Sequence, residues 1–378
     1  MTAKIIIAPD KFKGSLDSFD ICRVITDSLS KSLYQSGIYS FPLADGGDGF
    51  AAVLKHYLET TTIQCTTKDP LERTISSSYE WDERTATAII ELAAASGLAL
   101  LKKKEQNPLH TSTYGTGLLI ANAINKGAKK IILGIGGSAT NDAGIGILAA
   151  LGFVFLNKEE QSLSPVGANL SAIEKIILPA DIPAIDFEIA CDVTNTLYGS
   201  NGAAYIYAPQ KGASETEVQL LNEGLQNFAI RILQQTGKDI AHIPGTGAAG
   251  GVAAGLMAFF NTALVSGAEK IISISQLENY VSDADLIITA EGKIDAQTGS
   301  GKVIGQVAAI GKKYGVPVIA ICGSNELPEN LYKQIGLDAV YQIANTTDKD
   351  ESIKFAAVFL NRKIKTILPE LEKYVRRE

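Results

Sequence analysis

Short runs of consecutive apolar residues, many of them β-branched, recur along the chain and alternate with longer stretches of mixed character. Continuous rather than alternating apolarity is typical of strands that are covered on both faces, as in a parallel sheet between helices. We therefore expect an α/β protein with largely parallel strands. The runs predict buried strands at residues 4–8, 39–43, 85–92, 130–133, 187–191, 286–289 and 317–322.

Apolar residues spaced three and four apart predict amphipathic helices between several of these strands. One helix spans residues 18–33, where Asp17 or Ser18 supplies the N-cap, and another spans 303–315. The same spacing predicts a helix in the C-terminal region. Because proline lacks the amide hydrogen that a helix interior needs, we expect Pro369 to break or restart that helix.

Residues 62–82 follow a different pattern, because polar and apolar positions alternate around the letters "DPLE". This alternation predicts an antiparallel hairpin. A chain of 378 residues is also too long for one ordinary hydrophobic core, which indicates two domains. We predict that residues 1–61 and 283–378 form one discontinuous domain, that 62–282 are inserted as a second, and that a cleft lies between them.

Composition narrows the class of protein. Hydrophobic residues make up 46% of the chain and charged residues 20%, as in a globular protein. The formal net charge of -7 opposes binding to nucleic acid, and no apolar run approaches the roughly 20 residues of a membrane helix. We expect a cytoplasmic protein without nucleic-acid or membrane partners, and the sequence leaves a homo-oligomer open. The four cysteines and three histidines are scattered, which favours free thiols over a zinc site or a Ser-His-Asp triad.

Five of the predicted strands run into loops of glycine and charged residues, and in open α/β sheets ligands bind beyond the carboxyl ends of the strands. Glycines allow backbone N–H groups to approach an anion, lysines add positive charge, and carboxylates can hold a divalent cation. This combination predicts a phosphoryl-transfer site that uses Mg²⁺. The charged candidates are Asp10, Lys11, Lys13, Asp45, Asp48, Asp142, Asp192, Lys211, Glu291, Lys293, Asp295 and Lys302.

Common nucleotide-binding motifs were compared with these loops. Neither a Walker A pattern nor a protein-kinase signature is present in the sequence. Residues 134–139 resemble a dinucleotide fingerprint, which keeps a NAD-dependent oxidoreductase of a small hydroxy acid as an alternative, and a non-catalytic metabolite-binding protein is another. A similar stretch at 245–250 has no strand before it and is interpreted as a helix start packed tightly against a neighbour. Tyr79 and Trp81 are expected in a core.

Ordered motifs along most of the chain resemble one family, the bacterial glycerate kinases that begin "APDSFKGSL". The segments that carry the resemblance are "APDKFKGSL" (8–16), "PLADGGDG" (42–49), "GIGGSATNDAGIG" (134–146), "ACDVTN" (190–195), "PQKGAS" (209–214), "GTGAAGG" (245–251) and "ITAEGKIDAQTGSGK" (288–302). The resemblance implies ATP-dependent, Mg²⁺-assisted phosphorylation of D-glycerate, with 2-phosphoglycerate the favoured product. It also implies two α/β domains, one flavodoxin-like with three layers and one similar to a restriction endonuclease. The sequence departs from the family pattern at Lys11, Asp48 and Ala290.

The resemblance and the charge pattern together suggest roles for individual residues. Lys13 would neutralise transferred charge, and either Asp45 or Asp192 would accept the proton of the glycerate hydroxyl or hold Mg²⁺. Lys211 would bind the glycerate carboxylate. The expected ATP-binding residues are Gly136, Gly137, Ser138, Asn141, Glu291 and Lys293. The other expected substrate-binding residues are Asp10, Lys11, Ser15, Gly46 and Gly47, and the expected metal ligands are Asp142, Asp192 and Asp295.

Overall fold

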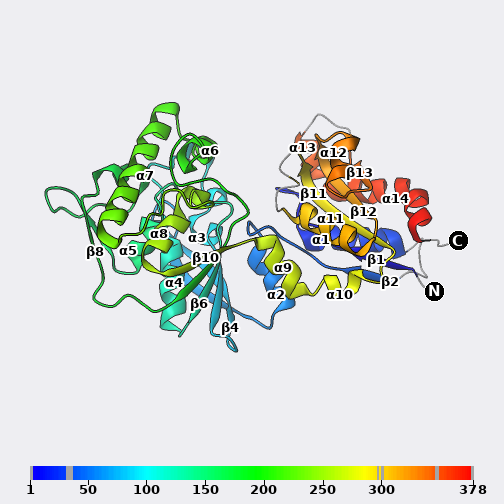
Figure 1. Cartoon of the computed structure of the whole chain (residues 1–378), viewed down its shortest axis with the longest axis horizontal. Helices are drawn as coiled ribbons and strands as arrows, with labels where there is room; N and C mark the ends of the chain where they lie inside the picture. The colour runs from blue at the N-terminus through cyan, green and yellow to red at the C-terminus, as the bar shows by residue number, and fades with distance from the viewer. Residues whose placement is uncertain (1–2, 31–36, 296–297, 299–301, 345–348, 376–378) are drawn as a thin grey trace. The chain divides into compact units, whose positions relative to one another are not determined.

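The chain forms two compact units in the computed structural model. Unit 1 comprises Met1–Asp45 and Ser266–Glu378, and unit 2 comprises Gly46–Val265. Both units alternate helices and strands, so the mixed α/β class with mainly parallel strands is confirmed (Figure 1). The structure describes residues 3–30, 37–295, 298, 302–344 and 349–375.

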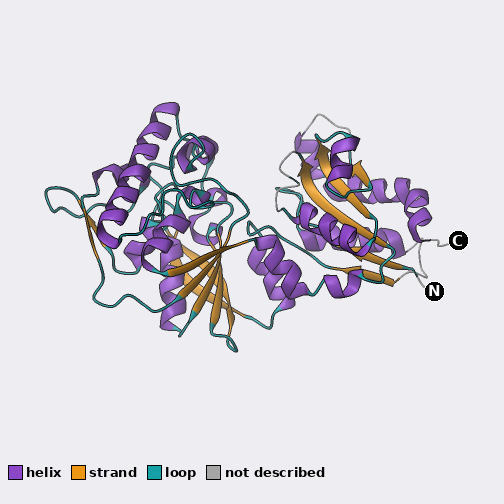
Figure 2. Ribbon diagram, in the orientation of Figure 1, coloured by secondary structure: helices purple, strands orange, loops and turns teal. Residues whose placement is uncertain are grey.

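Unit 1 is built on a five-stranded sheet in which every neighbouring pair is parallel. The strands, in their order across the sheet, are β13 (Ala339–Gln342), β12 (Val318–Asn325), β11 (Leu286–Ile294), β1 (Lys4–Ile7) and β2 (Gly37–Ser40). Figure 2 shows helices on both faces of this sheet. The continuous apolar runs of β1, β11 and β12 therefore reflect cover on both faces, as predicted.

The helices of unit 1 form the two outer layers around this sheet. One face is covered by α1 and α14, whose apolar residues share a core with Ile5, Ile288 and Ile319. On the other face α11 lies close to Ile287 and Val318, and α9 and α10 pack beside it. The helices are α1 (Ser18–Ser30), α9 (Gly267–Ser275), α10 (Glu278–Val281), α11 (Val303–Tyr314), α12 (Glu329–Gln334), α13 (Lys349–Lys354) and α14 (Ala356–Val375).

Two predicted helices of unit 1 are confirmed by their capping geometry. The Asp17 carboxylate accepts a hydrogen bond from the backbone N–H of Asp20, as an N-cap does, at 2.7 Å. Helix α11 ends at Gly315, whose φ of 69° is left-handed and therefore suits glycine. The predicted end of the first helix, at residue 33, lies outside the described residues.

The predicted break at Pro369 is wrong, because α14 continues through it to Val375. Proline in a helix interior costs about 3 kcal/mol. The buried residues Leu360, Ile364 and Ile367 precede the proline and Leu371 follows it on the same face. Burying aliphatic side chains stabilises by about 1.5–3 kcal/mol each, so the continuous apolar face outweighs the proline.

Unit 2 contains a six-stranded sheet with a parallel and an antiparallel part. The strands, in their order across the sheet, are β10 (Asn261–Val265), β9 (Asp186–Ala190), β6 (Lys130–Gly134), β5 (Thr87–Glu91), β4 (Thr74–Asp82) and β3 (Thr61–Lys68). The first four strands are parallel, whereas β4 runs antiparallel to both of its neighbours. The predicted hairpin is thus confirmed as β3 and β4. A separate pair consists of β7 (Val154–Leu156) and β8 (Lys175–Ile177).

Unit 2 contains a large apolar core that receives Tyr79 and Trp81, as predicted. Trp81 is only 4% exposed. The α-helices are α2 (Phe50–Tyr57), α3 (Ala93–Ser96), α4 (Tyr114–Asn125), α5 (Ile145–Ala150), α6 (Ala203–Tyr207), α7 (Glu215–Thr236) and α8 (Val252–Phe259). Short 3₁₀ turns are η1 (Leu98–Leu100), η2 (Lys103–Glu105), η3 (Gly167–Ala172), η4 (Pro209–Lys211) and η5 (Ala248–Gly250). Among the described residues, every helix is too short or too polar to serve as a membrane-spanning segment.

The limits of the two units lie earlier in the chain than the predicted domain limits. Helix α2 packs on β4 and β5 and so belongs to unit 2, although residues 1–61 were predicted in the other domain. Helices α9 and α10 pack on α11 and belong to unit 1, although residues 62–282 were predicted to include them. That the two units fold as separate domains stays a prediction.

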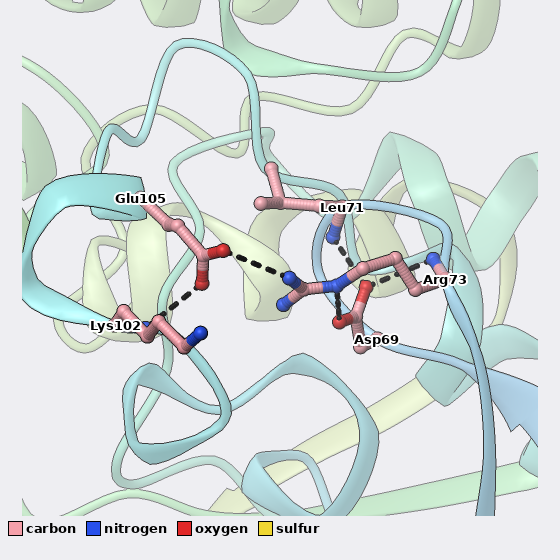
Figure 3. Close-up of polar contacts among 5 residues, drawn as sticks. All are labelled: Asp69, Leu71, Arg73, Lys102 and Glu105. Atoms are coloured by element: carbon pink, nitrogen blue, oxygen red, sulfur yellow. Dashed lines mark hydrogen bonds and ion pairs between the residues drawn. The ribbon is translucent and has the colours of Figure 1, made fainter.

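A buried aspartate organises the turn of the hairpin (Figure 3). The carboxylate of Asp69 accepts hydrogen bonds from the backbone N–H groups of Leu71 and Arg73, each at 2.9 Å, and from the Arg73 guanidinium. The guanidinium also donates to Glu105 at 3.0 Å, and Glu105 accepts from the backbone N–H of Lys102. Asp69 therefore orients Arg73, and Arg73 ties the hairpin turn to η2.

We predict that Asp69→Ala lowers the free energy of unfolding of unit 2 by about 1–3 kcal/mol, because three donors lose a charged acceptor. Urea denaturation followed by fluorescence measures this directly, since Trp81 is the single tryptophan of the chain and lies on β4. Arg73→Ala is the matched control, and we expect a smaller loss because its side chain is 46% exposed. Identical denaturation midpoints for Asp69→Ala and the unmodified protein would contradict this role.

Candidate functional site

In unit 1, charged side chains gather where β1 and β11 end, as the parallel register predicts. We call Asp10, Lys11, Asp45, Glu291 and Lys302 the acidic cluster. The ammonium of Lys11 lies 2.8 Å from a carboxylate oxygen of Asp45 and 3.6 Å from one of Asp10. The ammonium of Lys302 lies 3.6 Å from Oε1 of Glu291. Three carboxylates therefore share two lysines.

Burial and mutual repulsion raise the pKa of two of these carboxyls to about 7. For Asp10 burial is the larger cause and Asp45 adds to it, while Lys11 opposes both. For Glu291 burial again dominates, Lys302 opposes it, and the neighbouring aspartates add to it. Oε2 of Glu291 is buried and has no hydrogen-bond partner among the described residues. The fully ionised form of the acidic cluster, with three carboxylates against two ammonium groups, is therefore disfavoured in the protein alone.

Two positions that depart from the family pattern also belong to this region. Lys11 contributes its ammonium to the acidic cluster through the ion pair with Asp45. Ala290 is buried in β11, and its carbonyl accepts a hydrogen bond from the backbone N–H of Asp10 at 2.8 Å. Because this contact uses only backbone atoms, alanine in place of glycine preserves it.

The other predicted residues of unit 1 are more exposed. Lys13 has an exposed side chain, and its backbone N lies close to Gly292. Ser15 donates its hydroxyl hydrogen to the carbonyl of Phe12 within the same turn, at 3.3 Å. Lys293 is half exposed and pairs with Glu326 at 3.0 Å and with Asp295 at 3.5 Å. Local ion pairing therefore accounts for Lys293 and Asp295 without a ligand.

In unit 2, glycines from distant segments pack backbone against backbone where β6 and β9 end. We call Gly46, Gly47, Gly134, Gly136 and Ala190 the glycine cluster. The N–H of Gly136 donates to the carbonyl of Gly46 at 3.3 Å, and a Cβ on Gly136 would lie 2.3 Å from Cα of Gly47. Gly46 has a φ of +70° and its own Cβ would lie 2.8 Å from Cβ of Ala190. These positions require glycine for close approach as well as for conformation.

The second glycine-rich stretch supports the first rather than forming a site of its own. Gly250 and Gly251 directly precede α8. A Cβ on Gly250 would lie 2.2 Å from the carbonyl oxygen of Thr140, and one on Gly251 would lie 2.9 Å from Cα of Ala143. The interpretation of this stretch as a tightly packed helix start is confirmed.

Asp142 is fully buried, and its carboxylate is occupied by donors of the protein itself. It accepts from the N–H and the hydroxyl of Thr113, at 2.8 and 2.7 Å, and from the N–H groups of Gly144 and Gly146, at 3.1 and 3.3 Å. Burial raises the pKa of Asp142, and these hydrogen bonds oppose the rise. Since Thr113 precedes α4 and Gly144 precedes α5, the geometry favours a role in anchoring the loop over the predicted role as a metal ligand.

Two residues beside Asp142 have buried polar atoms without partners. The side chains of Thr140 and Asn141 lie inside unit 2. Within the described part of the chain, the hydroxyl of Thr140 and both amide atoms of Asn141 make no hydrogen bond to protein. Buried polar groups are normally satisfied, so these atoms are available to a bound polar partner. Asn141 was among the predicted residues, whereas Thr140 carried no signal in the sequence beyond its place in the loop.

The last two predicted site residues of unit 2 are Lys211, which is buried, and Asp192, which is half-buried. Lys211 lies on η4, is 3% exposed, and donates to Oγ of Ser138 at 2.6 Å and to the carbonyl of Thr140 at 2.7 Å. Burial lowers its pKa to about 7, and the charge of Asp142 partly opposes this shift. Asp192 is half-buried and follows Ala190, the last residue of β9, which pairs with Gly134. The limit between the units falls at the peptide bond between Asp45 and Gly46.

Comparison with known proteins supports the same family as the sequence motifs. The model of the glycerate kinase family matches residues 5–371. A glycerate kinase of Halalkalibacterium halodurans is 40% identical over 90% of this chain and 90% of its own length. A glycerate 2-kinase of Escherichia coli K12 is 38% identical over 90% of both chains.

A solved structure extends the similarity to the fold. The crystal structure of a Salmonella typhimurium LT2 protein covers 99% of this chain and 99% of its own, with a TM-score of 0.82 and 35% sequence identity. The resemblance of the motifs, the match over nearly the whole length and the shared fold agree. The chain belongs to the glycerate kinase family and is a kinase.

Proposed function

We propose that this kinase transfers a phosphoryl group from ATP to D-glycerate with the help of Mg²⁺ and forms 2-phosphoglycerate. The observation that carries the proposal is the glycine cluster at the ends of β6 and β9, beside the loop of Ser138 and the buried ammonium of Lys211. Bare backbone and a nearby positive charge are the features that a polyphosphate needs. The names of the relatives and the favoured product of the family support the choice of glycerate and of its 2-position.

In unit 2, the proposal assigns the phosphates of ATP to Gly137 and Ser138, while Gly136, whose N–H already donates to Gly46, allows the close packing of the turn. Gly137 has a φ of +70°, and a turn of this kind between neighbouring amides directs N–H groups to one side. The amide of Asn141, which lacks a partner among the described residues, serves the same ligand or a water bound with it. Lys13, which is exposed in unit 1, neutralises the charge that develops on the transferred group.

In unit 1, the proposal assigns Mg²⁺ to the acidic cluster. The donor set fits, because Asp10, Asp45 and Glu291 supply carboxylate oxygens and one oxygen of Glu291 has no partner among the described residues. Within the described residues, no three acidic, histidine or cysteine side chains are arranged to hold a metal ion on their own. A site here would therefore give Mg²⁺ one or two carboxylates and leave the rest of its shell to phosphates and water. When bound, the ion neutralises charge on the phosphates.

The remaining roles concern glycerate. Asp45 and Asp192 are the two candidates for the carboxylate that accepts the hydroxyl proton. Lys11 and Ser15 bind glycerate near the turn that follows β1. The predicted contact between Lys211 and the glycerate carboxylate is not carried into this proposal, because that ammonium is buried and already donates to Ser138 and Thr140.

The direct test is phosphorus NMR of the protein incubated with ATP, MgCl₂ and D-glycerate. We expect ADP and 2-phosphoglycerate to form together, and EDTA to abolish both because Mg²⁺ is removed. ADP release that does not depend on glycerate, or a product phosphorylated at the 3-position, would contradict the proposal. A change in NADH absorbance without ATP would instead support the oxidoreductase alternative, and thermal stabilisation by glycerate without turnover would support a binding protein.

We predict that Glu291→Gln raises the Mg²⁺ concentration for half-maximal activity about tenfold, because the amide keeps the shape of the side chain but removes a buried negative charge. Activity measured across a Mg²⁺ titration at saturating ATP reports the change. Glu326→Gln is the matched control, since Glu326 is 61% exposed in the same unit, and we expect it to behave like the unmodified protein. Equal Mg²⁺ requirements for the two variants would remove Glu291 from the metal site.

A further inference from the structure

Lys211 is the buried lysine of unit 2, and its ammonium is directed to the loop that follows β6. A buried ammonium is costly unless hydrogen bonds and opposite charge compensate for the lost water. Here the compensation comes from Oγ of Ser138 and the carbonyl of Thr140, at 2.6 and 2.7 Å, and from the charge of Asp142. Lys211 thus joins η4 to both ends of a three-residue stretch of the loop.

This geometry determines what the hydroxyl of Ser138 can do. In its charged form Lys211 donates hydrogen bonds and accepts none, so Ser138 then acts as the acceptor in the bond between them. A serine hydroxyl has one hydrogen to donate in addition. Throughout the described part of the chain, no group accepts that hydrogen. The hydroxyl of Ser138 is therefore held as a donor whose acceptor comes from outside the protein.

We propose that Lys211 is a positioning residue for ATP, which holds the loop after β6 and presents the Ser138 hydroxyl as a hydrogen-bond donor to a phosphate oxygen. This inference rests on the proposed function, because it takes ATP as the ligand of the loop. An acceptor with negative charge fits best, since it accepts from the hydroxyl and also interacts favourably with the ammonium behind that hydroxyl. Lys211 acts through Ser138 and does not touch glycerate.

The two possible roles of Lys211 make opposite predictions for the two substrates. If it positions Ser138 for ATP, Lys211→Met raises the KM for ATP at least tenfold and leaves the KM for glycerate within twofold. If it binds the glycerate carboxylate, the KM for glycerate rises and the KM for ATP stays unchanged, which would overturn the inference. Lys158→Met is the control, because Lys158 is 81% exposed in the same unit, and we expect both KM values to be unaltered.

Variants at Ser138 test whether Ser138 and Lys211 depend on each other for ATP binding. Ser138→Ala should raise the KM for ATP about as much as Lys211→Met does, and the double variant should be no worse than Lys211→Met alone, because neither residue works without the other. Ser138→Thr keeps the hydroxyl and should restore the KM for ATP to within threefold of the unmodified protein. Effects of Lys211→Met and Ser138→Ala that multiply in the double variant would show independent roles and overturn the inference.

Loss of folding is separated from loss of positioning by Trp81 fluorescence during urea denaturation. If Lys211→Met does not fold, the pair Ser138→Ala and Ser138→Thr decides alone, and a KM for ATP that Ser138→Ala leaves unchanged overturns the inference. Failure of the proposed function is recognised separately, because the unmodified protein would then release no ADP in response to glycerate. Calorimetric titration with ATP would still compare the variants, with the same tenfold loss of affinity expected for Lys211→Met and Ser138→Ala.

Discussion

Close backbone approaches beside the loop after β6 are the constraint on which the candidate site of unit 2 depends. Gly136 approaches Gly47 at a distance that excludes any Cβ, and Gly250 approaches the carbonyl of Thr140 in the same way. Such contacts fix the path of the loop after β6 from two sides, without using side chains. The shape of the loop is therefore held by packing, and Asp142 and Lys211 reinforce that shape from within.

Much of the fold could be predicted from the sequence, because its main strands are buried on both faces. The apolar runs at β1, β5, β6, β9, β11 and β12 are short and rich in β-branched residues. This length and composition favour a buried strand over a helix. The short strands β7 and β8, of three residues each, carry no pattern long enough to detect. Pro369 was misjudged for a related reason, since local propensity was visible in the sequence and the buried face that overrides it was not.

The candidate site was predicted less completely than the fold. Residue types and the strand-end rule were enough to find the loops that hold Asp10, Asp45 and Ser138, although Glu291 proved to lie within β11. They could not distinguish Asp142, which is consumed by four internal hydrogen bonds, from carboxylates that remain available for a cation. The orientation of the Lys211 side chain could not be predicted either. Its burial and its hydrogen bonds depend on Thr140 and Ser138, which precede it in the sequence by 71 and 73 positions.

Burial disfavours the charged form of ionisable groups in each of the two units. Burial raises the pKa of Asp10 and Glu291 in unit 1 and lowers that of Lys211 in unit 2, so each group is held where its charged form is disfavoured. A cation relieves the first strain and an anion relieves the second. Folding thus leaves an unfavourable charge environment in each unit, which a bound ligand of opposite charge would compensate within that unit.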